Sequence, residues 1–140
     1  MSDFNAWNEK IIKEYRENEG ELSGDFEGKP VLLLHNEGRK TGKEYVNPVM
    51  YQEVGEGRFA VFASKGGMPT DPDWYRNVLE NPDVQVELGA RKIKAKAREA
   101  TGVERERIWE RQKKDFPQFA EYEKATEGIR EIPVVVLEAA

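Results

Sequence analysis

Residues 31–51 read VLLLHNEGRKTGKEYVNPVMY and hold the clearest structural pattern in the 140-residue sequence. The largely apolar run 31–36 predicts a strand that is covered on both faces. The polar residues 37–43, which include two glycines, predict a tight turn, and residues 44–53 read as a second strand. Pro48 interrupts that strand. Because proline has no N–H to donate, we expect a bulge or an unpaired edge position there.

The sequence on either side extends this hairpin to about six strands with flanking helices. We expect further strands at residues 58–64, 84–88, 92–98 and 132–137, and helices at residues 3–19, 72–81, 103–115 and 116–126. Short turns join most of the strands, which favours an α+β domain whose antiparallel strands close into a small barrel, because closure leaves few exposed edges. At this length a single domain over residues 1–140 is the simplest organisation.

The N-terminal segment, from about residue 3 to residue 19, predicts an amphipathic helix. Phe4, Trp7, Ile11 and Tyr15 follow one another at steps of three and four residues, which places them in one apolar stripe. Ser2 is a suitable N-cap, because its side-chain oxygen can accept a hydrogen bond from an N–H group of the first turn.

The residue composition excludes several kinds of chemistry. The chain has no cysteine, which removes disulfides, thiolate nucleophiles and cysteine-ligated metal centres. Its one histidine, His35, ends a buried strand and is expected to be structural, so a multi-histidine metal site is excluded as well. We therefore expect no metal site. An enzyme of this composition would most simply take its chemistry from an organic cofactor.

The charge pattern argues against two kinds of partner. The net charge of −5 at pH 7 does not favour general nucleic-acid binding. The lysines of residues 92–98 alternate with Ile93, Ala95 and Ala97, so they predict a solvated sheet face instead. No apolar run approaches the roughly 20 residues of a membrane span, and the N-terminus has no signal-peptide pattern. A cytoplasmic location is the expectation.

Two loops offer polar groups that could bind an anion. Residues 37–43 combine Arg39, Lys40 and Thr41 with glycines that let backbone N–H groups approach the same ligand. The stretch is not a P-loop, because the spacing G-x-x-x-x-G-K-[ST] is absent. The alternative explanation is a solvated hairpin turn, which is common in β-rich proteins. Residues 63–67, ASKGG, supply a hydroxyl, a cation and two flexible positions, or simply connect a strand to the next helix.

Two aromatic groups could form the walls of a site for a planar ligand. The helix start PDWYRN contains Trp74, and the segment FPQFAEY presents Phe116, Phe119 and Tyr122 at steps of three. Either group could also belong to the hydrophobic core, which is the simpler explanation for Trp74.

The sequence resembles the deazaflavin-dependent nitroreductase family in four stretches that occur in the same order: GRKTGKEYVNP, ASKGG, DPDWYRNVLENPDVQVEL and IPVVVLE. The resemblance covers roughly residues 20–140. These small proteins are known from mycobacteria and other actinobacteria, and they use coenzyme F420, a flavin-like ring with a phosphate and an oligoglutamate tail. The resemblance implies a split β-barrel like that of FMN-binding oxidases, with F420 as the cofactor.

The resemblance also implies which residues hold F420. Arg39, Lys40 and Thr41 match the anion-binding motif of the family and would hold the phosphate. The residues implied as cofactor-binding are Arg39, Lys40, Thr41, Tyr45, Val46, Asn47, Pro48, Val49, Met50, Phe62, Ala63, Ser64, Lys65, Asp73, Trp74, Tyr75, Arg76 and Asn77. Tyr45 departs from the family pattern, in which a basic residue often stands at this position.

The activity implied by the resemblance is hydride transfer from reduced F420 to an electrophilic acceptor. Ser64 is the implied catalytic residue, as a hydrogen-bond donor to the acceptor. Phe116, Phe119 and Tyr122 are the implied substrate-binding residues. Because two of these replace tyrosines of family members that reduce nitroimidazoles, a quinone is favoured as acceptor over a nitro compound or an activated enone.

The N-terminal helix would cover the acceptor site, and its apolar stripe could weakly touch the inner surface of the membrane. Two alternatives stay open. One is an FMN-dependent oxidoreductase with the same barrel, and the other is a non-catalytic protein that carries F420.

Overall fold

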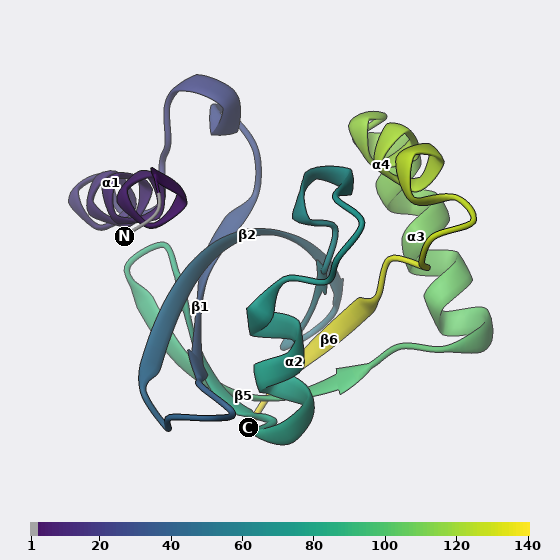
Figure 1. Ribbon diagram of the computed structural model, residues 1–140. Helices are drawn as coiled ribbons and strands as arrows, with labels where there is room; N and C mark the ends of the chain where they lie inside the picture. Colours follow the sequence, from purple (N-terminus) through teal and green to yellow (C-terminus); the bar gives the residue numbers. More distant parts are fainter. Residues whose placement is uncertain (1–2) are drawn as a thin grey trace.

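The computed structural model describes residues 3–140 and contains a closed six-stranded antiparallel barrel (Figure 1). The order around the barrel is β1-β2-β3-β6-β5-β4. The strands are β1 Val31–Glu37, β2 Glu44–Gly55, β3 Arg58–Phe62, β4 Asp83–Leu88, β5 Arg91–Glu99 and β6 Val134–Ala139. This confirms the predicted α+β barrel, although β2 is two residues longer than expected and β3 two residues shorter.

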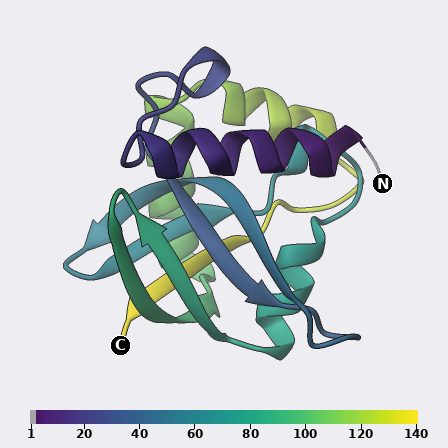
Figure 2. The same cartoon turned by 90° about the vertical axis from the view of Figure 1, so that its left-hand side faces the viewer.

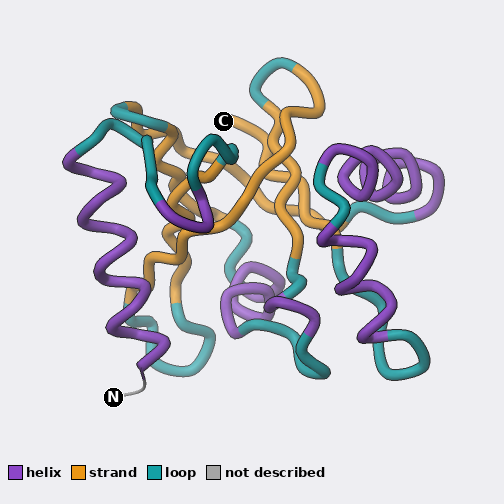
Figure 3. The backbone as a smooth tube through the Cα atoms, turned by 90° about the horizontal axis from the view of Figure 1, so that it is seen from above, coloured by secondary structure: helices purple, strands orange, loops and turns teal. Residues whose placement is uncertain are grey.

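Within residues 3–140, four α-helices pack around the barrel: α1 Asp3–Glu17, α2 Asp73–Glu80, α3 Gly102–Asp115 and α4 Gln118–Thr126. Helix α1 lies on one side of the barrel and α3 with α4 on the opposite side (Figures 1 and 3), while Figure 2 shows α1 running across the strands. Short 3₁₀ turns occur at Gly24–Phe26 and Lys65–Gly67. Among residues 3–140, no helix combines the length and the hydropathy needed to cross a membrane.

Alternate residues of the strands build two hydrophobic clusters. Leu32 and Leu34 of β1 pack with side chains of the other strands and of α2, whereas Val31 and Leu33 pack with residues of α1, α3 and α4. Strand β1 is therefore buried on both faces, as its apolar sequence predicts. On β5 the lysines are exposed and alternate with more buried apolar residues, which agrees with the predicted solvated face.

The start of β2 is a sheet edge. Residues 44–50 of β2 pair with β1, including Leu33 opposite Pro48, whereas the pairing of β2 with β3 begins at Tyr51 opposite Val61. Pro48 thus occupies an unpaired edge position, which is one of the two predicted alternatives. The bulge of this strand lies further on, between Glu53 and Gly55.

Helix α1 is fixed to the barrel near its C-terminal end. The Tyr15 hydroxyl donates a hydrogen bond to the carbonyl of Glu87 at 3.0 Å and accepts one from the N–H of Gly89 at 2.8 Å. Tyr15 is buried, whereas Trp7 is 43% exposed, so the predicted apolar stripe is buried only in part. The helix ends at Glu17 rather than at residue 19. The predicted N-cap Ser2 and the side chain of Phe4 lie outside the described part of the structure.

Candidate active site

A cavity of about 900 Å³ lies beside the unpaired edge of β2. It extends from the turn between β1 and β2 to α4, and the loop after β3 and the start of α2 also line it. The predicted site residues in its lining are Arg39, Lys40, Thr41, Tyr45, Asn47, Pro48, Val49, Met50, Phe62, Ser64, Lys65, Asp73, Trp74, Asn77, Phe119 and Tyr122. The fold therefore brings together segments that the sequence separates widely.

Five predicted site residues lie outside this lining. Val46 and Phe116 pack against the hydrophobic core, Ala63 is completely buried, and Arg76 is exposed on the outer side of α2. Tyr75 turns towards the end of β5, where its hydroxyl donates a hydrogen bond to a glutamate. Burial and this hydrogen bond raise the pKa of Tyr75. The alternation of side chains along strands and helices explains why adjacent residues of one motif point in different directions.

The turn at residues 38–43 is closed by its own backbone. The N–H of Gly38 donates to the carbonyl of Lys43 at 2.7 Å, and the N–H of Gly42 donates to the carbonyl of Gly38 at 2.9 Å. A Cβ atom on Gly38 would lie 2.9 Å from the ring of Tyr45 and 3.1 Å from the hydroxyl of Thr41. A larger residue at position 38 would therefore require the ring of Tyr45 to shift.

The guanidinium of Arg39 is held by a network of asparagine side chains. Arg39 donates to Oδ1 of Asn77 from its backbone N–H at 3.2 Å and from Nη1 at 2.9 Å. Asn77 in turn donates to Asn36 at 2.8 Å, and Asn36 donates to Asn47 at 2.9 Å. Asn36 and Asn77 are buried, so this network fixes one wall of the cavity and the position of Arg39.

The N–H groups of Gly38 and Gly42 are used within the turn and not on a ligand, contrary to the expectation from the sequence, so the donors at this end of the cavity are cationic side chains. Lys40 is exposed, and no ion pair of Lys40 with residues 3–140 is found. Arg39 lies 3.6 Å from the carboxylate of Asp73, which starts α2. A planar guanidinium beside a free ammonium suits a phosphate, which accepts several charge-assisted hydrogen bonds. The donor set thus fits the phosphate of F420.

Aromatic and aliphatic side chains form the middle of the cavity. Trp74 and Phe119 are 5% and 4% exposed and belong to the two core clusters, and both also line the cavity. Phe119 makes edge-to-face contacts with Phe62 and Tyr122, at centroid distances of 5.5 and 5.2 Å. The two predicted roles, core residue and wall of a site, are therefore compatible. Such walls favour a planar ring.

The loop after β3 has an unusual backbone conformation. Lys65 has a φ of 47°, and the following Gly66 and Gly67 have φ values of 64° and 83°. Ser64 precedes them in the right-handed region and lines the cavity. The ammonium of Lys65 donates to the hydroxyl of Thr70 at 3.2 Å. A non-glycine residue with positive φ is uncommon and is often found at functional sites.

Several residues of the lining were not predicted. They are Trp7, Asn8, Phe26, Asn36, Gly38, Gly66, Met68, Pro72 and Gln118. Gly38, Gly66 and Pro72 belong to segments that the sequence singled out, and Trp7 to the predicted stripe of α1, where its ring lies 5.7 Å from that of Phe26. Gln118 lies within the segment FPQFAEY, which the sequence also singled out, whereas Asn8, Phe26, Asn36 and Met68 carry no local signal, because only the tertiary fold brings them to the cavity.

A buried ionic network joins α1 to the barrel outside the cavity. Glu87 accepts two hydrogen bonds from Arg16, at 3.1 and 2.7 Å, and lies 2.6 Å from Nε2 of His35. The hydrogen bond from Arg16 and that from His35 lower the pKa of Glu87 to about 2, against the opposing effect of burial. His35 also lies 3.3 Å from Glu44, so it is a structural residue, as expected.

Comparison with known proteins identifies the family of this chain. Residues 7–139 match the model of the F420H(2)-dependent quinone reductase family. The F420H(2)-dependent quinone reductase Rv1261c of Mycobacterium tuberculosis is 33% identical over 127 residues, which cover 88% of this chain and 83% of that protein. The structure of an F420-H2 dependent reductase, FDR-A, is 41% identical, with a TM-score of 0.70, and the match covers 78% of this chain and 94% of FDR-A.

A further solved structure, described as a domain-swapped dimer, is 35% identical with a TM-score of 0.71, and the match covers 98% of this chain and all of the other. The resemblance found in the sequence is thereby confirmed, with F420 rather than FMN as the cofactor of the family. This chain belongs to the F420H(2)-dependent quinone reductase family.

Proposed function

We propose that this chain transfers a hydride from reduced F420 to a quinone inside the cavity beside β2. The observation that carries the proposal is the joint placement of a cationic turn and an aromatic-walled cavity. Rv1261c, whose name states this activity, and FDR-A, whose name states F420-H2 dependence, support the same assignment. Non-catalytic storage of F420 would use the turn and the walls around the ring, but it would give no role to the end of the cavity lined by Phe119 and Tyr122.

The residues around the turn would hold the cofactor. Arg39, Lys40 and Thr41 would bind its phosphate, and the buried Asn77 would keep Arg39 in position. Trp74 and Met50 would enclose the ring and exclude water from it. Reduced F420, when bound, supplies the hydride; the protein needs no strong acid or base of its own. This explains how a chain without cysteine and with one histidine can catalyse a redox reaction.

The other end of the cavity would hold the acceptor. Phe119 and Tyr122 of α4 line it there, and Trp7 of α1 also belongs to the cavity lining. Ser64 lines the cavity, and its side chain makes no cap hydrogen bond to its own 3₁₀ turn. The hydroxyl can therefore donate to an oxygen that gains negative charge during hydride transfer. A weak contact of α1 with a membrane surface remains a prediction.

Anaerobic oxidation of F420H2 by menadione, followed by absorbance, tests the proposal. Removing one neutral donor to a developing charge costs roughly 1–3 kcal/mol, so Ser64→Ala should lower kcat about 5- to 150-fold without changing F420 affinity. Ser23→Ala is the control, because Ser23 lies outside the cavity and pairs with Glu14. Binding of F420 without turnover would indicate a carrier. A Ser64→Ala variant as fast as the control would remove Ser64 from the mechanism.

A further inference from the structure

Arg130 lies in the segment between α4 and β6 and binds the loop that follows β3. Its guanidinium group makes four hydrogen bonds to residues 63–71. Nε donates to the carbonyl of Met68 at 3.1 Å, and Nη2 donates to the carbonyl of Ser64 at 2.9 Å. Nη1 donates to the carbonyl of Ala63 at 3.1 Å and to Oδ1 of Asp71 at 2.9 Å. Four of the five N–H donors of Arg130 are thus used on one loop.

These contacts orient the peptide planes that face the cavity. In a trans peptide the C=O and N–H groups point in opposite directions. Because Arg130 holds the carbonyls of Ala63 and Ser64, the N–H groups of Ser64 and Lys65 point away from it. Ser64 and Lys65 line the cavity, whereas Arg130 does not. The backbone of Ser64 is in the right-handed helical region, and Lys65 has a positive φ. Two successive residues in these conformations form a concave group of N–H donors, called a nest, which typically binds negatively charged oxygens.

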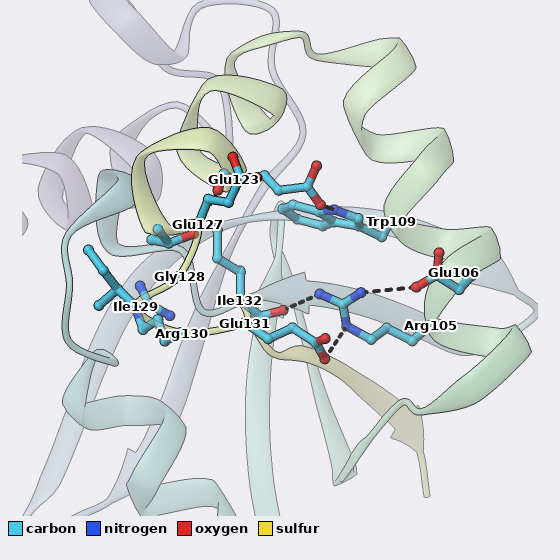
Figure 4. A pocket seen from close by; sticks show the side chains of 11 residues that line it. Arg105, Glu106, Trp109, Glu123, Glu127, Gly128, Ile129, Arg130, Glu131 and Ile132 are labelled. Atoms are coloured by element: carbon cyan, nitrogen blue, oxygen red, sulfur yellow. Dashed lines mark hydrogen bonds and ion pairs between the residues drawn. The ribbon is translucent and has the colours of Figure 1, made fainter.

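The segment that carries Arg130 is itself held by helices α3 and α4. Its N–H donates to the carbonyl of Thr126 at the end of α4, at 3.0 Å. Figure 4 shows Arg105 of α3 reaching the same segment, with Nη2 donating to the carbonyl of Ile132 at 2.7 Å and Nε lying 3.3 Å from Glu131. Arg105 is buried and lies over the ring of Trp109. The loop after β3 is thus tied through Arg130 to a rigid part of the fold.

We propose that Arg130 is a positioning residue for the reaction. It fixes the strained loop so that the hydroxyl of Ser64 and the N–H groups of Ser64 and Lys65 face the bound ring and the acceptor. Three consecutive residues of this loop, 65–67, have a positive φ, which is costly for the non-glycine residue Lys65. The hydrogen bonds from Arg130 therefore help to hold a conformation that the loop would not keep without them. This inference rests on the proposed function, and its test separates the two.

The test compares Arg130→Met and Arg130→Lys with the control Arg98→Met. Methionine keeps an unbranched stem but removes all donors. Lysine keeps the charge opposite Asp71 but cannot reproduce the planar fork that binds three carbonyls. Arg98 is a suitable control, because its guanidinium also makes several hydrogen bonds, to Glu104 and Glu138, and it lies outside the cavity lining.

Hydrogen exchange of the ligand-free protein measures directly how often the loop after β3 opens. In Arg130→Met the amides of residues 64–68 should exchange about tenfold faster than in wild type, since the hydrogen bonds from Arg130 suppress local opening of the loop. F420 affinity and kcat with menadione should each fall about tenfold, because four hydrogen bonds to the loop are lost. Arg130→Lys should recover thermal stability relative to Arg130→Met without recovering kcat. Arg98→Met should lose stability alone.

Unchanged exchange at residues 64–68 in Arg130→Met, or full recovery of kcat by Arg130→Lys, would overturn the inference. If the wild-type protein bound no F420, the proposed function would fail, and the exchange measurement would still decide whether Arg130 holds the loop.

Discussion

The hydrogen bonds between Asn77 and Arg39 provide a quantitative prediction about the anion-binding turn. Asn77 is 4% exposed and accepts from Arg39 twice, so Asn77→Ala removes two of the hydrogen bonds that hold Arg39 and leaves the side-chain oxygen Oδ1 of Asn36 without its donor. A hydrogen bond to a charged group contributes roughly 1.5–3 kcal/mol. Since Arg39 is only partly buried, we take the lower figure, about 1.5 kcal/mol, which corresponds to about a tenfold weaker binding of F420.

A double-mutant cycle with Arg39→Ala isolates this effect. F420 fluorescence titration of the four proteins should show that Asn77→Ala has no further effect once Arg39 has been removed. Asn81→Ala is the matched control, because the Asn81 side chain donates a hydrogen bond to the carbonyl of Glu37 at the start of the same turn and lies outside the cavity lining; it should retain F420 affinity. Independent, multiplicative losses of affinity in the cycle would refute the view that Asn77 acts by positioning Arg39.

Two further predictions concern the ionic network and the turn. Because the pKa of Glu87 is lowered from 4.5 to about 2, its contribution to stability is complete above pH 4.5 and is lost as the pH falls towards 2. Glu87→Gln should therefore lower the free energy of unfolding in urea by roughly 3 kcal/mol at pH 7, and the difference from wild type should shrink at pH 3; a constant difference would contradict the assignment. Gly38→Ala should keep the fold, because the exposed ring of Tyr45 can move aside, but should weaken F420 binding several-fold. Unchanged affinity in the same titration would show that the exact position of the turn is unimportant.

Much of the fold follows from local patterns in the sequence. The apolar run of β1 and the alternation along β5 reflect burial on two faces and on one face, respectively, and both are visible within a few residues. Pro48 indicated a break in sheet pairing but not whether the break is a bulge or an unpaired edge. Both leave the backbone N–H of that residue without a partner in the sheet, so proline fits either one. The choice between them depends on where β3 begins to pair, which is a long-range property.

The candidate site could be predicted only in part. Residues of recognisable motifs, such as Arg39 and Trp74, lie in the cavity lining. Asn36 was not predicted, because its role depends on Asn77, which lies 41 positions further along the chain. The role of Arg130 depends equally on a loop more than 50 positions away. Such contacts carry no periodicity, since they arise only when the barrel closes.

The most direct test of the whole account is a parallel titration of the purified protein with F420 and FMN, followed by ligand fluorescence. Lys40→Ala and Lys43→Ala form a matched pair, because both remove one charge from the same turn and only Lys40 lines the cavity. We predict saturable binding of F420 and not of FMN, weakened about tenfold by Lys40→Ala, as expected for a lost charge-assisted contact, and unchanged by Lys43→Ala. Tight binding of FMN, or equal effects of the two substitutions, would contradict the proposed cofactor site.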